Sequence, residues 1–341
     1  MSEAEVTRDG LRGQRPGREA PVGVQGPSRP RGRRGEPGAE FTSYYGRPII
    51  KKPTWSARDI AGYLFLGGLA GASSVLAAGA DLTGRPRLAR TGKIGALGAI
   101  SLSAAALVHD LGKPERFTNM LRVIKPTSPM SVGSWILAVY GPAAGSAAIL
   151  DVTGRLPRIG RAATCWAALA GPAVASYTAV LVADTAVPAW HEAYRELPFL
   201  FVGSAATAAA GLGMLAAPRE ETGPARMAAA YGAVVELAAA ERMERRLGMI
   251  SEPYTTGRGG RLMRAGKALT IAGAVTGVAL GGRCRAAAVL SGAALLAGSA
   301  CTRFGVFEAG IASARDPKYT VLPQRQRLRD QNPEMGTAPP V

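Results

Sequence analysis

The stretch IAGYLFLGGLAGASSVLAAGA, Ile60–Ala80, contains 21 consecutive residues without a charge. A helix needs about 20 such residues to cross the hydrocarbon core of a bilayer. Three further uncharged windows of comparable length follow at Gly133–Leu150, Ala162–Ala183 and Pro198–Ala217. One such window fits a buried Ala-rich helix of a soluble bundle, but four in one chain favour a membrane protein.

Weaker apolar windows complete the pattern at 94–108, 227–247, 268–282 and 286–302. Backbone groups in lipid have no water to bind, so segments of this length must be helical. We therefore predict an all-α integral membrane protein, with eight transmembrane helices in a bundle between disordered polar tails.

Composition divides the 341 residues into three parts. The net charge is +17, and hydrophobic residues make up 47% of the chain. Polar, Pro/Gly/Arg-rich residues occupy 1–58 and 310–341, which leaves 59–309 as the predicted transmembrane domain. The RGRRG run near the amino terminus is not followed by an apolar export segment. We interpret residues 1–58 as a disordered basic tail and pre-helix segment, and 310–341 as a polar tail. No nucleic-acid-binding module is recognisable.

Small residues predict where helices touch, since helices in lipid pack through close backbone approach. Gly67 and Gly71 in the first window have the G-x-x-x-G spacing, and Gly141 and Gly145 repeat it in the second strong window. Both pairs are predicted helix contacts.

The chain has few residues that bind metals or haem. Its three cysteines are isolated from one another, and its two histidines are His109 and His191. Membrane b-type haem usually takes two His ligands that face inward from helices, whereas one of these caps a segment and the other lies in a loop. We therefore expect no haem or metal of the protein's own.

Polar groups at membrane depth are costly, and each is a functional candidate. Asp59 and Tyr63 are spaced i, i+4 and share one helix face at the mouth of the first segment. A carboxylate beside a phenol can hydrogen-bond a quinone carbonyl and exchange its proton, although a tyrosine there is also an ordinary interfacial anchor. Tyr177 is a candidate for the same pocket. Glu236 fits two interpretations equally: a proton relay or quinone-side acid, or a protonated or Arg-paired carboxylate that holds two helices together.

Several motifs resemble the NrfD, or polysulfide-reductase membrane-subunit, family. They occur in the order FTSYYGRPIIKKPTW (Phe41–Trp55), YLFLGGLAGAS (Tyr63–Ser73), DLGKPERFTNML (Asp110–Leu121), SPMSVGSW (Ser128–Trp135) and YTAVLVADTAVPAWH (Tyr177–His191). The resemblance covers roughly residues 41–310. It implies an eight-helix, haem-free subunit that passes electrons between the quinone pool and a ferredoxin-like iron–sulfur subunit, which serves a molybdopterin catalytic subunit.

The resemblance also implies site residues. A quinone or menaquinone, as exchangeable substrate, is expected near Asp59, Tyr63 and Tyr177. Some members carry Asn and His at the first two of these positions. Asp110, Arg116 and Asn119 lie in a loop that faces the iron–sulfur subunit in the family, and structuring that loop is their equally weighted alternative role.

Other functions stay open from the sequence. Eight segments, interrupted helices and an intramembrane glutamate also fit a secondary transporter or ion channel. A pure membrane anchor without a quinone site is the third possibility. The expected location is the bacterial plasma membrane, crossed several times, and the Lys/Arg count of the loops leans toward cytoplasmic tails without deciding the orientation.

Overall fold

The computed structural model describes residues 55–111 and 124–331, with the isolated positions 50, 53, 115 and 119–122 and two short strands near the amino terminus. The chain divides into two units, residues 1–41 and 42–341. In the first unit β1 (Glu5–Thr7) pairs antiparallel with β2 (Gly10–Arg12), with Val6 opposite Leu11. The rest of the predicted tail at 1–58 lies almost entirely outside the described residues.

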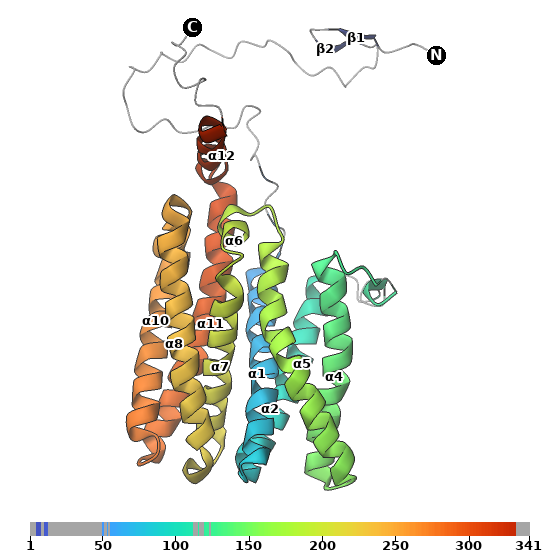
Figure 1. The fold of residues 1–341 in the computed structure, drawn as a ribbon, viewed down its shortest axis with the longest axis vertical. Helices are drawn as coiled ribbons and strands as arrows, with labels where there is room; N and C mark the ends of the chain where they lie inside the picture. Colours follow the sequence, from blue (N-terminus) through green and yellow to red (C-terminus); the bar gives the residue numbers. More distant parts are fainter. Residues whose placement is uncertain are drawn as a thin grey trace. The chain divides into compact units, whose positions relative to one another are not determined.

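The second unit is a bundle of long helices (Figure 1). A π-helical turn, Ala57–Ala61, leads into α1. The long helices are α1 (Gly62–Leu82), α2 (Pro86–Asp110), α4 (Pro129–Thr153), α5 (Pro157–Ala183), α7 (Leu197–Ala216), α8 (Gly223–Leu247), α10 (Gly257–Leu280) and α11 (Arg285–Arg315). Shorter helices connect or follow them: α6 (Pro188–Glu192), the 3-10 turns Arg219–Glu221 and Gly248–Ser251, α9 (Glu252–Thr255) and α12 (Lys318–Gln331).

The carboxyl-terminal boundary differs from the polar tail that we expected from residue 310. Helix α11 continues to Arg315, and α12 then runs from Lys318 to Gln331. Four residues of the last turns of α11, including Ile311 and Ala314, are buried against the bundle. The apolar packing therefore extends past the point at which the charge pattern of the sequence changes.

The long helices form two neighbouring groups of four. Helices α1, α2, α4 and α5 pack together, as do α7, α8, α10 and α11, and α7 joins the groups through contacts with α1 and α5 (Figure 1). At one end of the bundle lie the start of α1, the ends of α2 and α5, and the start of α4. The residues of the predicted quinone pocket therefore come from chain segments that meet at one end.

Six of the described helices are long and apolar enough to cross a membrane: α1, α2, α4, α5, α7 and α11. They contain the four strong windows and two of the weaker ones. The remaining two windows lie in α8 and α10, so the predicted count of eight spans is not confirmed.

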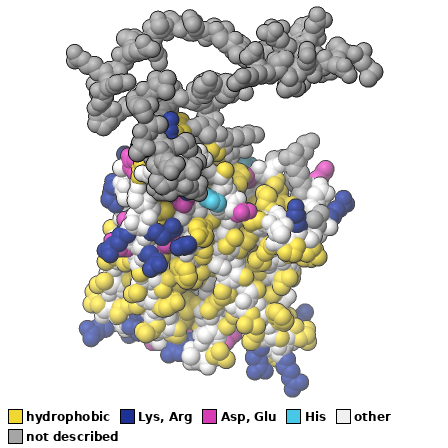
Figure 2. Space-filling model, turned by 45° about the horizontal axis from the view of Figure 1, so that its top comes forward, with side chains coloured by type: hydrophobic (Ala, Val, Ile, Leu, Met, Phe, Trp, Pro, Cys, Tyr) yellow, Lys and Arg dark blue, Asp and Glu magenta, His cyan; other side chains and the backbone are white. Residues whose placement is uncertain are grey.

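Only 22% of the apolar window of α4 is buried within the protein. Figure 2 shows apolar side chains over the flank of the bundle. A surface of this kind requires lipid rather than water.

Glycines set the closest helix crossing in the first group. A methyl group on Gly71 of α1 would lie 2.3 Å from the carbonyl oxygen of Gly171 in α5, so the two backbones touch there. Gly67 also faces α5 and α2, which confirms the first predicted contact pair. The second prediction is wrong at Gly141, where a methyl group would meet nothing within 4 Å. A methyl group on Gly145 would lie 3.8 Å from Leu97 of α2, so the second glycine of this pair does face a neighbouring helix, at an ordinary contact distance.

These two glycines give a matched test of the packing. We expect Gly71→Ala to lower the stability of the bundle by about 1–3 kcal/mol, because the methyl group must push α5 away from α1. Gly141→Ala should leave the stability unchanged or slightly raised, because alanine favours the helix by up to about 1 kcal/mol. Thermal unfolding of the detergent-solubilised protein measures both. Equal melting temperatures for the two variants would contradict the crossing.

Candidate functional site

Two tyrosines meet between α1 and α5. The side chains of Tyr63 and Tyr177 hydrogen-bond to one another, and they are only 2% and 8% exposed. Ser103 of α2 donates a hydrogen bond to the backbone oxygen of Tyr63 at 3.2 Å. On the other side, a methyl group on Gly133 of α4 would overlap the Tyr177 ring and hydroxyl. Four helices therefore fix this pair of hydroxyls, and the absence of a side chain at Gly133 makes room for it.

The carboxylate predicted for this pocket lies one turn before Tyr63, in the π-helical segment. Asp59 is half-buried, and its Oδ2 lies 3.2 Å from Nδ1 of His109 at the end of α2. His109 is 79% exposed, so this pair connects the start of α1 to water. The backbone N–H of Asp59 also donates to the Ser56 hydroxyl at 3.4 Å, which caps the turn. Wide turns of this type often occur at functional sites.

The predicted partner-facing loop is described in part. Asp110 accepts a hydrogen bond from the Ser56 backbone N–H at 3.3 Å. It therefore ties the end of α2 to the chain entering α1, which supports the structural role weighed for it. Asn119 is exposed. Arg116 lies outside the described residues.

Glu236 is buried in α8 among hydroxyl groups of three other helices. Its carboxylate accepts hydrogen bonds from Thr302 of α11 at 2.7 Å, from Thr207 of α7 at 3.3 Å and from Thr270 of α10 at 3.5 Å. The neighbouring hydroxyl of Ser204 donates instead to Ser299 of α11 at 2.9 Å. Such donors stabilise a carboxylate away from water and can also exchange protons with it.

A fully buried cation accompanies this acid. Arg303 follows Thr302 in α11 and interacts electrostatically with Glu236. Its Nη2 donates to the backbone oxygen of Phe201 at 2.6 Å and its Nε to that of Leu64 at 3.4 Å, while the guanidinium stacks 3.8 Å from the centre of the Phe201 ring. Among the described residues no hydrogen-bond partner is found for its Nη1. Arginine stays charged even when buried, so Glu236 provides a compensating charge.

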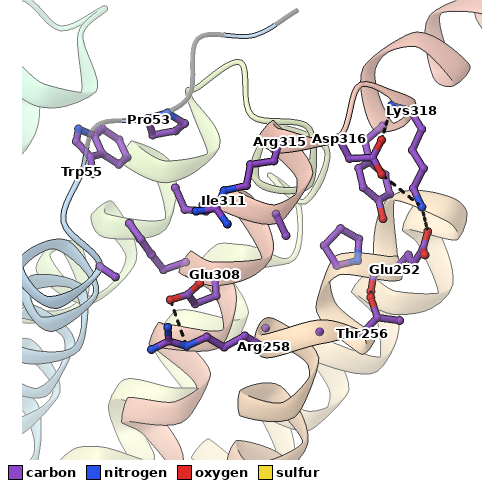
Figure 3. A pocket seen from close by; sticks show the side chains of 17 residues that line it. Pro53, Trp55, Glu252, Thr256, Arg258, Glu308, Ile311, Arg315, Asp316 and Lys318 are labelled. Carbon is purple, nitrogen blue, oxygen red and sulfur yellow. Dashed lines mark hydrogen bonds and ion pairs between the residues drawn. The ribbon is translucent and has the colours of Figure 1, made fainter. Parts of the chain in front are cut away.

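A cavity of about 1030 Å³ opens at the end of the bundle that contains Asp59 (Figure 3). Trp55 and Ala57 form one wall, and Phe307 and Ile311 of α11 form another. Ion pairs cross its rim: Arg258 with Glu308 at 3.5 Å, and Lys318 with Glu252 at 2.9 Å and with Asp316 at 3.6 Å. The hydrogen bond with Lys318 lowers the pKa of Glu252, and the same bond raises the pKa of Lys318.

The sequence identified some of this arrangement. The structure brings Tyr63 and Tyr177 together and places Asp59 at the adjacent turn, whereas Glu236 lies in the second helix group. Sequence reasoning missed the roles of His109 and Arg303. His109 was considered only as a haem ligand, although its place at the end of a segment signalled an interfacial position. Arg303 directly follows an uncharged window, and only the folded α11 shows that it is buried.

Residues 52–228, just over half of the chain, match the family described as "Polysulphide reductase, NrfD". This matched range includes Asp59, Tyr63, His109 and Tyr177 and ends within α8. Glu236 and Arg303 follow it. No curated protein matches the chain.

The buried charges are tested by a double-mutant cycle. We expect Arg303→Met and Glu236→Gln each to lower the melting temperature, because each removes the compensating partner of a buried charge. The double variant should lose less stability than the sum of the two single losses, and the difference, the coupling free energy, should be about 0.5–3 kcal/mol. Arg315→Met, at the exposed end of the same helix, is the control and should combine additively with Glu236→Gln. If the losses caused by Arg303→Met and Glu236→Gln were also additive, the two side chains would not be coupled.

Proposed function

Because the chain belongs to the polysulphide reductase NrfD family and is a multi-pass membrane protein, we propose that it is the quinone-reactive membrane subunit of an oxidoreductase complex. The complex lies in the bacterial plasma membrane. A ferredoxin-like iron–sulfur subunit and a molybdopterin catalytic subunit are its partners, and quinone or menaquinone is its exchangeable substrate. In this proposal α8 and α10 also cross the membrane, which makes eight spans.

The hydrogen-bonded pair of Tyr63 and Tyr177 is the observation that carries the proposal. Two phenols on facing helices present hydroxyls that can each donate to, or accept from, one oxygen of a quinone head group. Burial excludes competing water, which strengthens such hydrogen bonds. A quinone oxygen that binds between the two hydroxyls would replace their contact with one another.

Proton exchange is assigned to Asp59. Oxidation of a quinol to a quinone releases two electrons and two protons, and reduction takes up the same number. Asp59 accepts or returns a proton at the mouth of α1, and His109 passes it to water, since its imidazole contacts the carboxylate at 3.2 Å and is largely exposed. The electrons pass to the iron–sulfur subunit, which docks at this end of the bundle near Asp110, Arg116 and Asn119.

Glu236 is assigned a second proton function. Its hydroxyl donors come from α7, α10 and α11, so its carboxylate can take up a proton through these contacts and, once protonated, return it within the second helix group. A relay there carries protons away from the quinone site toward the opposite face. The complex then conserves energy across the membrane.

The quinone site is tested in the assembled complex. We expect Tyr177→Phe to raise the KM for quinol about fivefold, because loss of one hydrogen bond costs about 1 kcal/mol. Asp59→Asn should lower kcat by a factor on the order of 10², the usual size of a lost general acid or base. The matched controls are Tyr231→Phe on the exposed face of α8 and Asp184→Ala at the end of α5. Unchanged turnover in both site variants would mean that the protein is an anchor without a quinone site.

Proton movement through Glu236 can be measured separately from quinone turnover. Glu236→Gln keeps most of the hydrogen bonds but cannot exchange a proton, so we expect quinone turnover to continue with fewer protons moved per electron pair. Proteoliposomes with a trapped pH dye report both quantities. Glu241→Gln, exposed on the same helix, should leave the ratio unchanged. A normal ratio in Glu236→Gln would leave this residue only the role of holding helices together.

A further inference from the structure

A second depression of about 380 Å³ runs along the outer face of the first helix group, between α4 and α5. Its walls are Val132, Trp135 and Val139 of α4 and Ala170 and Ala173 of α5. We name this depression the α4–α5 groove. The two alanines leave the α5 side hollow, whereas the larger α4 side chains form a raised edge.

The groove faces lipid. Val132, Trp135 and Val139 are all exposed, although they lie within a predicted membrane span. Polar groups occur only where the groove meets the start of α4, at Lys125 and Ser131. A long apolar molecule can therefore lie along its length without leaving a polar group unsatisfied.

The inner wall of the groove adjoins the tyrosine pair. Gly133 directly follows the lining residue Val132 in α4, and the Tyr177 ring occupies the space where a side chain of Gly133 would lie. Side chains on a helix lean toward its amino terminus, so Tyr177 leans over the turn that contains Ala173. Two lining residues therefore adjoin the pair: Val132 precedes Gly133, and Ala173 lies one helical turn before Tyr177.

We propose that the α4–α5 groove holds the isoprenoid tail of the quinone whose head group binds Tyr63 and Tyr177. This inference rests on the proposed function and makes long-tailed quinones the preferred substrates. The nearness of the lining residues Val132 and Ala173 to the tyrosine pair selects this occupant. An ordinary membrane phospholipid, with its phosphate at Lys125, is the alternative that the experiment must distinguish.

Filling the groove separates tail binding from head-group binding. Val139→Trp places a large ring in the groove from an already exposed position. In the assembled complex we expect it to raise the KM for long-tailed menaquinol by about tenfold, since the ring displaces the tail from the groove walls and the loss of roughly ten van der Waals contacts has this effect. The KM for menadiol, which has no tail, and the kcat for both quinols should stay unchanged. Val275→Trp, at an exposed position of α10, is the matched control.

The other outcomes are distinct. An unchanged KM for menaquinol would overturn the proposal and leave the groove to ordinary lipid. An equal rise for menaquinol and menadiol would also overturn it, because the substitution would then act on the head-group site. If the unmodified complex oxidises neither quinol, the proposed function itself is wrong, and the assignment of the tail site is wrong for the same reason.

As a second measurement, menaquinone with a photoreactive tail should label the peptide 132–139 in the unmodified protein, and labelling elsewhere would contradict the assignment.

Discussion

Direct backbone contact between glycines sets where the long helices of the bundle cross one another. Helices surrounded by lipid gain little from burying apolar side chains against one another, so they associate where the backbones come close. Gly71 meets Gly171 where α1 crosses α5, Gly203 meets Gly232 where α7 crosses α8, and a third such contact joins α7 and α11. Glu236 lies one turn after Gly232, so the crossing that fixes α8 also brings its carboxylate within reach of the hydroxyls on α7.

The cost of polar groups in lipid explains why these contacts must be close. An isolated charge in a membrane span is expensive, and Arg303 has no water to reach. The protein offsets this cost with two backbone carbonyls, the face of Phe201 and the nearby charge of Glu236. A looser packing of α1, α7 and α11 would lengthen these contacts together. The small residues and the buried charges therefore depend on one another.

The sequence predicted the helices better than their contacts. Uncharged windows identified the spans because lipid excludes charge over a fixed length, but the same rule stopped the last window at Thr302, one residue before a buried arginine. The tyrosine pair was predicted from motifs, whereas its hydrogen bond depends on the α1–α5 crossing. Gly71 and Gly141 share one local pattern, and only the former meets another helix. Which face of a helix finds a partner is a property of the whole bundle, so the local sequence does not contain it.

The two polar sites lie in different halves of the bundle, and α1 links them. Tyr63 directs its hydroxyl to α5 in the first helix group, while the carbonyl of the next residue, Leu64, accepts from Arg303 in the second group. Because α1 is a rigid helix, a shift at Tyr63, such as the proposed binding of a quinone head group would cause, also moves the Leu64 carbonyl against the guanidinium. Arg303 is electrostatically coupled to Glu236, so this displacement changes the field at the carboxylate. This link offers a physical route by which a displacement at the tyrosines reaches Glu236, the residue proposed to exchange protons.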